Sequence, residues 1–437
     1  MARGRLPLAG HLLSLARDPL RFLTSVGSDG SGLVRLDLGT TPMYLVTAYE
    51  PADDILAGQA GAFGVGRMFK QLSSLIGDSL ATLEGESHLK RRRLLQPPFL
   101  SRELPGYGGI MVRRAQSLSD SLREGRSTLM DRSFYRLTLS AAAEALFSVD
   151  LAGPVVAEVD RSLPVVTNGV ALRAFLPKAF ESLPLPLNRR YDLAVRRLRA
   201  VIETAIDQHR AAAPAGANLL SALMASRDAD SGEGLNDGQI RDEIITIMLA
   251  GTDTPAALLS WALYELERHP AAERRLHEEL DEVVGDRPAE LADVPRLPFT
   301  AQVLNEVSRL YSALLIMRRS TSPALVGGVE VPPGTDLLIC PYVIHRDPRF
   351  FPEPGRFDPD RWSSERAHRL PRKAYLPFGA GPHKCIGDSF AWAELVIVLA
   401  TVCSRWRLRT ATGHAVSAVP GVVPRPNSLP MIPEPRS

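Results

Sequence analysis

The feature that most constrains the fold is one long apolar helix pattern covering residues 236–269. Apolar residues recur there at helical spacing over about 33 residues, and a helix of that length spans roughly 50 Å, enough to cross a globular body. Gly251 and Pro255 lie inside the pattern, where glycine's flexibility and proline's missing N–H predict a kink. The sequence therefore predicts a fold built around one central helix.

The remaining patterns predict a mainly α protein of the α+β class. Two segments of alternating apolar and polar residues, 33–37 and 43–47, predict an early hairpin. The other predicted elements are helical segments within 109–213, helices at 271–284, 299–311 and 387–402, and a strand-rich stretch at 320–342. Because no repeat or linker divides the chain, we expect a single domain over residues 1–437, with its β-rich parts at about 30–60 and 318–342.

Composition excludes several classes of protein. With 45% hydrophobic and 23% charged residues the chain is globular, and its net charge of +2 creates no overall field for nucleic acid or an anionic membrane. Three cysteines without a CxxC pair exclude a disulfide framework and a zinc ribbon, which favours a reducing, cytoplasmic location. The uninterrupted apolar runs fall short of the ~18 residues of a membrane span, so neither a span nor a signal peptide is expected.

A glycine-rich loop, residues 378–387, carries Cys385 at the start of a predicted helix. Backbone N–H groups and the positive end of the helix favour a thiolate there, and the glycines let a flat ligand approach the backbone. Cys340 and Cys403 lack these surroundings and are expected to be small buried apolar residues.

The spacing F-x-x-G-x-x-x-C-x-G in this loop resembles the haem-binding signature of the cytochrome P-450 family. The resemblance implies that Cys385 is the thiolate ligand of the iron of haem b, and that Phe378, Gly379 and Gly387 contribute to the cofactor site. It also implies the P-450 fold along nearly the whole chain, with the long central helix and a small β-rich N-terminal region.

Two further segments resemble the same family. Glu306 and Arg309 are similar to its Glu-x-x-Arg pair, and residues 359–362 to its Pro-x-Arg-Phe segment, with tryptophan in place of phenylalanine. The implied triad of Glu306, Arg309 and Arg361 would form a charge network behind the haem, where loss of one partner is costly. We therefore interpret the triad as structural.

Residues 250–254 are similar to the family's oxygen-activating segment, A-G-x-D/E-T. Splitting dioxygen requires protons in a pocket poor in water, so Thr254 at the oxygen and Asp253 exchanging with solvent form a proton relay, and Gly251 leaves room for oxygen. The alternative is that Asp253 and Thr254 only bond to nearby backbone. Pro255 departs from the family pattern, which has threonine or serine there.

Four basic residues occupy positions similar to those that bind haem propionates in this family: His88, Arg92, Arg318 and His383. The other residues of the cluster at 90–93 are expected either to form a solvated basic face or to contact a redox partner, as are Arg372 and Lys384.

The substrate pocket is expected to be mostly apolar, which favours a lipophilic small molecule. Its predicted wall residues are Phe63, Met68, Phe69, Leu72, Ile247, Met248, Ala313, Leu314, Leu315 and Ile316. The proline-rich segment 175–191 is either a lid or a plain surface connection. The sequence also looks like soluble bacterial P-450s of natural-product pathways, including some that oxidise terpenes.

The implied activity is monooxygenation, with O2 as co-substrate and electrons ultimately from NAD(P)H. The length leaves no room for a fused reductase, so a separate ferredoxin and ferredoxin reductase are the implied partners. Two alternatives remain, a peroxygenase that uses hydrogen peroxide and a non-catalytic module that recruits partners. Retention of Asp253 and Thr254 argues against both.

Overall fold

The structure is a computed structural model that describes residues 2, 6, 10–27, 30–38, 41–147, 149–173, 183, 185–212, 218–228 and 230–436. Its α-helices are α1 (Leu12–Arg17), α2 (Pro19–Gly27), α3 (Tyr49–Asp53), α4 (Arg67–Ile76), α5 (Gly85–Leu95), α6 (Leu104–Ser121), α7 (Met130–Leu146), α8 (Val149–Arg173), α9 (Pro186–Ala212), α10 (Leu219–Ala225), α11 (Asp237–Arg268), α12 (Pro270–Val283), α13 (Pro298–Leu310), α14 (Pro341–Ile344), α15 (Ser364–Ala367) and α16 (Asp388–Arg405).

The strands are β1 (Leu33–Leu38), β2 (Thr41–Val46), β3 (Phe63–Val65), β4 (Thr128–Leu129), β5 (Ile316–Ser320), β6 (Ala324–Val326), β7 (Val329–Val331), β8 (Asp336–Ile339), β9 (Trp406–Thr410), β10 (Ala418–Val419), β11 (Arg425–Pro426) and β12 (Pro430–Pro435). The largest sheet has the order β1-β2-β8-β5-β3. β1 and β2 form the predicted antiparallel hairpin, and β2 pairs in parallel with β8, so the two predicted β-rich parts make one sheet.

The central helix is confirmed as α11, a 32-residue helix that is continuous through Pro255. Asn236 and Gln239 close its start with a reciprocal capping box. α11 contributes to two core clusters, one shared with α6, α7, α13 and α16 and the other with α7, α8, α9 and α10. Among the described residues it alone has the length and hydropathy of a membrane span, and 61% of its most apolar window is buried, as in a core helix.

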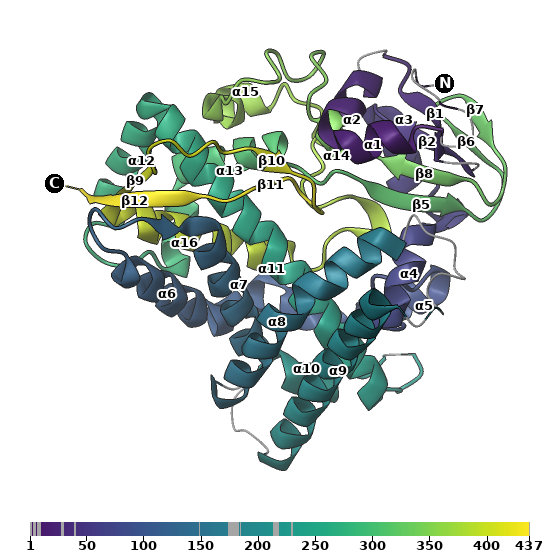
Figure 1. Cartoon of the computed structure of the whole chain (residues 1–437), viewed down its shortest axis with the longest axis horizontal. Coiled ribbons are helices and arrows are strands. Elements are labelled where there is room, and N and C mark those ends of the chain that lie inside the picture. Colours follow the sequence, from purple (N-terminus) through teal and green to yellow (C-terminus); the bar gives the residue numbers. More distant parts are fainter. Residues whose placement is uncertain are drawn as a thin grey trace.

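Figure 1 shows how the parts are arranged: the large sheet with α1 and α2 lies at one side, and the long helices fill the other. The C-terminal strands β9 and β12 cross the molecule beside α12 and α16, far from the N-terminus. α8 and α9 run side by side at the edge of the helical part.

Three features of the fold were not predicted. The β-rich part at 30–60 also contains α3 and a π-helical turn, η1 (Asp54–Gly58). The N-terminal helices α1 and α2 were not predicted. The sheet β4-β12-β9 was not predicted either, because β12 has the sequence PMIPEP, and its three prolines read as a loop rather than a strand.

Candidate active site

The loop that carries Cys385 is packed tightly against the N-terminal part of the chain. Cys385 N–H donates to Phe378 O at 2.9 Å, and Gly379 and Gly381 have φ values of +71° and +69°. A β-carbon at Gly381 would lie 1.7 Å from Leu56 O in η1. Only glycine fits there, so the loop glycines hold Cys385 in place by permitting a close backbone contact.

The Cys385 thiol does not become acidic through the loop alone. The residue as a whole is exposed, but the groups around its sulfur desolvate the thiol and raise its pKa, more than the Gly387 N–H and the charges of Arg92 and Lys384 lower it. The backbone N–H of Gly387 lowers the pKa of the thiol, as expected for this loop, but burial outweighs that effect. A bound metal cation would supply the missing stabilisation, since coordination deprotonates a thiol.

The four predicted propionate residues come from three separate parts of the chain and meet near this loop. The rings of His88 (α5) and His383 are 3.7 Å apart, centroid to centroid, with their planes tilted by 32°. Burial, together with Arg92 and Arg318, lowers the pKa of His88 to about 4, and burial with Arg318, His88 and Arg92 lowers that of His383 to about 3. Burial lowers the pKa of Arg318 (β5) to about 10.

These basic groups fit an anionic ligand. Among the described residues no carboxylate acts on the pKa of His88, His383 or Arg318, although all three side chains are largely buried. Near neutral pH Arg318 is the charged member of this trio, and a buried charge normally has a partner, while the two neutral imidazoles can donate hydrogen bonds, so the set suits the carboxylates of a haem. Arg92 instead donates to Pro382 O and Lys384 O, at 3.0 and 2.7 Å, and so fastens the cysteine loop to α5.

Of the neighbouring residues Arg318 and Arg319 in β5, only Arg318 belongs to the group of basic residues without an acid. Arg319 forms an ion pair with Asp336, its Nη1 lying 2.8 Å from the carboxylate. The alternation of side chains along β5 thus separates a neutralised arginine from one that lacks an acid.

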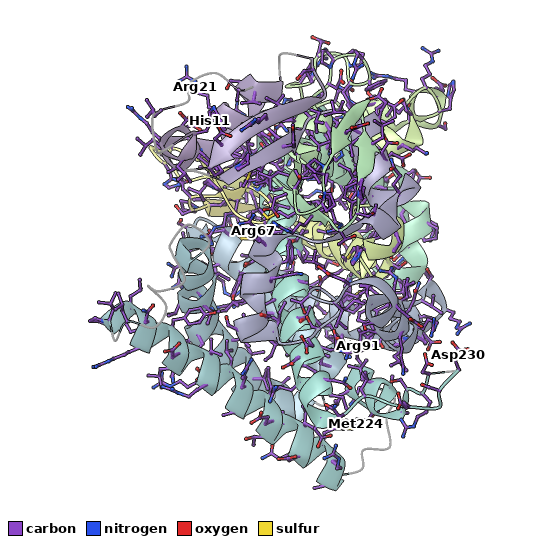
Figure 2. The ribbon with its side chains drawn as sticks, turned by 90° about the vertical axis from the view of Figure 1, so that its right-hand side faces the viewer. His11, Arg21, Arg67, Arg91, Met224 and Asp230 are labelled. Carbon is purple, nitrogen blue, oxygen red and sulfur yellow. The ribbon has the colours of Figure 1, made fainter. Side chains whose placement is uncertain are left out.

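The other basic residues of α5 have acidic partners, and only Arg91 departs from the expectation of a solvated or partner-facing cluster. Arg91 is buried and pairs with Glu243 of α11 at 2.6 Å, because α5 turns this side chain inward (Figure 2). Lys90 pairs with Glu233 at 2.7 Å, and Arg93 pairs with Asp228 and Asp230 at 3.1 Å each. Lys384 pairs with Asp388 at 2.6 Å, and the Arg372 side chain lies outside the described part.

The predicted oxygen-activating segment lies where part of the α11 surface is not buried by other elements. Ala250 is exposed and Gly251 half-buried, although both lie in the middle of the core helix. An open space therefore adjoins α11 at these residues. A β-carbon at Gly251 would contact only Ala142 Cβ, at 3.9 Å, so the geometry tolerates alanine there.

Asp253 and Thr254 are both half-buried beside this opening. Burial raises the pKa of Asp253, and Arg425 of β11 opposes the rise. The Tyr135 hydroxyl of α7 is buried without a hydrogen-bond partner among the described residues, and its pKa is raised by burial and by the Asp253 charge. Sequence reasoning missed Tyr135 and Arg425, since no local pattern marks residues that only tertiary packing brings to Asp253.

The triad of Glu306, Arg309 and Arg361 forms near the C-terminal end of α13. Arg309 makes two hydrogen bonds to Glu306, at 2.9 and 2.8 Å, and Arg361 Nε lies 3.5 Å from the same carboxylate. Glu306 also accepts from Asp358 N and from Trp362 Nε1, at 3.0 and 2.9 Å. The tryptophan that replaces phenylalanine thus supplies an additional donor to a fully buried carboxylate.

The predicted substrate walls fall into two groups. Phe63, Met248 and Leu314 are buried, the first two within core clusters. The half-buried group consists of Phe69, Leu72, Ile247, Ala313, Leu315 and Ile316. The side chain of Met68 and most of the segment 175–191 lie outside the described part of the chain, so the choice between lid and connection stays open. Cys340 and Cys403 are buried as expected, which raises the pKa of each thiol to about 12.

Comparison with known proteins finds matches along nearly the whole chain. The sequence profile described as "Cytochrome P450" matches residues 2–427. Cyclooctatin synthase of Streptomyces melanosporofaciens is 41% identical and aligns over 100% of this chain and 95% of that protein. Pentalenene oxygenase of Streptomyces avermitilis is 34% identical over 93% of this chain and 90% of that protein.

The fold comparison is equally extensive. The crystal structure of the cytochrome P450DA heme domain superposes with a TM-score of 0.89 at 24% identity, covering 99% of this chain and 97% of that one. This likeness concerns the fold alone, whereas the sequence matches extend to the family and its activity. The chain belongs to the cytochrome P450 family and is a monooxygenase of that family.

Proposed function

We propose that this monooxygenase oxidises a polycyclic terpenoid of secondary metabolism, with haem b as its cofactor. The observation that carries the proposal is likeness along the whole chain to relatives named for such substrates: cyclooctatin synthase, pentalenene oxygenase and cyclooctat-9-en-7-ol 5-monooxygenase, the last 36% identical over 100% of this chain. The half-buried apolar side chains of α4, α11 and residues 313–316 suit a lipophilic substrate.

Each motif that resembles the family then has a defined role in the proposal. Cys385 would hold the iron, while His88, Arg318 and His383 would receive the propionates in a buried region where, among the described residues, no acid acts on their pKa. Phe378, Gly379 and Gly387 shape the loop around the cofactor, and Arg92 fixes that loop to α5 through two carbonyls. The bound haem supplies the activation of dioxygen.

Side chains of α11, Asp253 and Thr254, form the proposed route for protons to the site. Asp253 holds a proton more readily than an ordinary aspartate, because burial raises its pKa, and Arg425 keeps the carboxylate form accessible. Thr254, at the adjacent helix position and also half-buried, is the second group of the proposed relay. Pro255 has no N–H, so the carbonyl of Gly251 lacks its helical donor and is available to a water molecule or a hydroxyl group.

Electrons come from a separate ferredoxin and ferredoxin reductase, ultimately from NAD(P)H, and the protein works in the cytoplasm. Because Lys90, Arg93 and Lys384 already have acidic partners, the ferredoxin would have to compete with these ion pairs. Docking through these residues is therefore expected to depend on ionic strength less steeply than docking through unpaired basic residues would.

The test is reconstitution with ferredoxin, its reductase and NADPH, using a panel of cyclic terpene hydrocarbons and alcohols. A cyclic terpenoid should shift the iron spin state and yield a product heavier by one oxygen atom. A Cys385→Ala variant should lose the thiolate-type carbonyl spectrum; retention of that spectrum would refute the ligand assignment. Equal turnover with hydrogen peroxide alone would favour the peroxygenase alternative.

A further inference from the structure

Arg91 of α5 and Glu243 of α11 form an ion pair that is almost completely withdrawn from solvent, with 7% and 1% of their side chains exposed. Burial raises the pKa of Glu243 to about 7, although the bond to Arg91 opposes the rise. Because both charges lose their water, such a pair stabilises a fold no better than apolar side chains of similar size. Stability alone is therefore a weak reason for charged side chains at this place, and their other contacts indicate a further role.

Both side chains also bind the backbone of the loop between α4 and α5, residues 77–84. Glu243 Oε1 accepts hydrogen bonds from Arg91 Nη1 at 2.6 Å and from Leu80 N at 2.9 Å. Arg91 Nη1 donates in addition to Asp78 O at 2.9 Å. We call this ion pair, with its two bonds to the loop, the Arg91–Glu243 clamp.

The loop is shaped to lie directly on α11. Gly77 has a φ of +52°, and a β-carbon there would collide with the carboxylate of Asp242, the neighbour of Glu243 in α11. Thr82 Oγ1 accepts from Ser79 N at 3.0 Å and donates to Gly77 O at 2.8 Å, which closes a turn within the loop. The turn thus keeps its own shape, and the clamp fixes its position relative to α11.

The loop brings Leu80 to the region of the expected substrate pocket. Leu80 is half-buried and packs against the same core cluster as Leu72 of α4 and Ile247 of α11, two of the predicted pocket walls. Glu243, Ile247 and Gly251 follow one another at intervals of four residues, so they lie along one side of α11. The clamp is therefore attached to the side of α11 that faces the pocket and the opening at Gly251.

We infer that Arg91 and Glu243 are positioning residues, which hold Leu80 and the loop 77–84 against the pocket and thereby set the affinity of the pocket for a bulky apolar ligand. The inference rests on the proposed function for the place of the pocket beside α4 and α11, but not for the identity of the substrate. If the loop is not held, only those molecules in which it is in place bind the ligand well. The dissociation constant then rises in inverse proportion to that fraction of molecules.

Two variants separate this role from a purely structural one. Arg91→Met/Glu243→Leu replaces the charges by apolar side chains of similar size, so it should keep most of the free energy of unfolding, but it removes both bonds to the loop. Glu243→Gln retains the Oε1 acceptor for Leu80 N and Arg91 and leaves the guanidinium without a countercharge. It should therefore unfold more easily and still hold the loop.

The first measurement is hydrogen–deuterium exchange of the haem-loaded proteins, read for a peptide that covers residues 77–84. In Arg91→Met/Glu243→Leu the amide of Leu80 has no acceptor and should exchange about tenfold faster or more, at nearly unchanged global stability. In Glu243→Gln its exchange should stay close to that of the unaltered protein.

The second measurement is spectroscopic titration with N-phenylimidazole and with imidazole. Both probes bind the iron through nitrogen, but only the phenyl ring extends into the pocket. Arg91→Met/Glu243→Leu should bind N-phenylimidazole about tenfold more weakly, as expected for the loss of one or two net hydrogen bonds, and should bind imidazole as before. Leu80→Ala, which leaves the clamp intact, should also weaken the binding of N-phenylimidazole alone.

The matched control is Arg409→Met/Glu273→Leu, which makes the same kind of replacement in an ion pair of 2.7 Å between β9 and α12, on the other side of the molecule from α4 and α5 (Figure 1). It should change neither the exchange of the loop nor the affinity for either probe. Unchanged exchange of the loop in Arg91→Met/Glu243→Leu, or an equal loss of affinity for both probes, would overturn the inference. So would an unchanged affinity of Leu80→Ala for N-phenylimidazole, or a Glu243→Gln variant as impaired as the double variant.

The outcome is separable from that of the proposed function. Amide exchange and titration with imidazoles need neither a terpenoid nor electrons. Terpenoid oxidation by a protein whose loop does not respond to the double variant refutes only the positioning role. A loop that responds as expected, in a protein that oxidises no terpenoid, refutes only the proposed function.

Discussion

Glu394 makes the stability of this protein depend on pH in a way that one substitution can isolate. It lies in α16 with 1% of its surface exposed, and its Oε1 has no hydrogen-bond partner among the described residues. Burial raises its pKa from 4.5 to about 8. Between these two values the folded chain keeps the proton while the unfolded chain releases it, so folding becomes less favourable as pH rises.

The magnitude follows from proton linkage. One proton bound only in the folded state changes the free energy of unfolding by about 1.4 kcal/mol per pH unit. From pH ~5 to pH ~8 the carboxyl group therefore removes about 4 kcal/mol of stability, and above pH ~8 the loss levels off. Glu394→Gln keeps the shape but cannot ionise, so the variant should gain on the unaltered protein by this amount across the range.

The assay is urea unfolding of both haem-loaded proteins at pH ~5, ~6, ~7 and ~8, comparing the difference in unfolding free energy. The burial of the new amide adds a constant offset, so the slope of the difference carries the result. Glu330→Gln, an exposed glutamate of β7, is the matched control and should give a flat line. A flat line for Glu394→Gln too would refute the reasoning, because the buried carboxyl would then have an ordinary pKa.

Three further outcomes are expected. Arg91→Ala leaves the Glu243 carboxylate buried without its partner and should lower the free energy of unfolding by about 3–5 kcal/mol in urea titration, with Arg91→Met/Glu243→Leu recovering most of it. Trp362→Phe introduces the residue usual in the family and removes the Trp362 N–H donor to Glu306. It should lower the free energy of unfolding by about 1.5–3 kcal/mol without altering the haem spectrum. Asp253→Asn should slow NADPH-driven product formation by about 10²-fold or more, measured by chromatography, while peroxide-driven turnover, which needs no relay, should change far less.

Local patterns were sufficient for the elements whose residues carry their own signal. The apolar periodicity of α11 and the alternation of β1 and β2 predicted these elements, and the cysteine loop pointed to the family. The strand β12 was missed because its prolines oppose a strand in isolation and are tolerated only beside β4 and β9. Its pairing partners lie far away in the chain, so no window of sequence contains the signal.

The candidate active-site residues also divide into those marked by a local motif and those that only tertiary packing brings together. Residues within one motif, such as Asp253 and Thr254, could be proposed from their spacing. Tertiary packing alone brings Arg425 of β11 to act on the pKa of Asp253, and Asp253 to act on the pKa of Tyr135 in α7. The raised pKa of Cys385 was also out of reach, because desolvation depends on how closely the surrounding elements pack. Motifs therefore suffice to propose the reacting groups, whereas packing decides their pKa values.

The arginines show why residue type alone does not reveal function. Arg91 is buried with an acid and holds α5 to α11, while Arg318 is buried and, among the described residues, no acid acts on its pKa. The two differ in what surrounds the guanidinium group, and a buried charge of +1 without an acidic partner among the described residues is the one most informative about a ligand. On this reasoning Arg318 predicts an anion within the protein, such as a haem propionate, which could not be inferred from a net charge near zero.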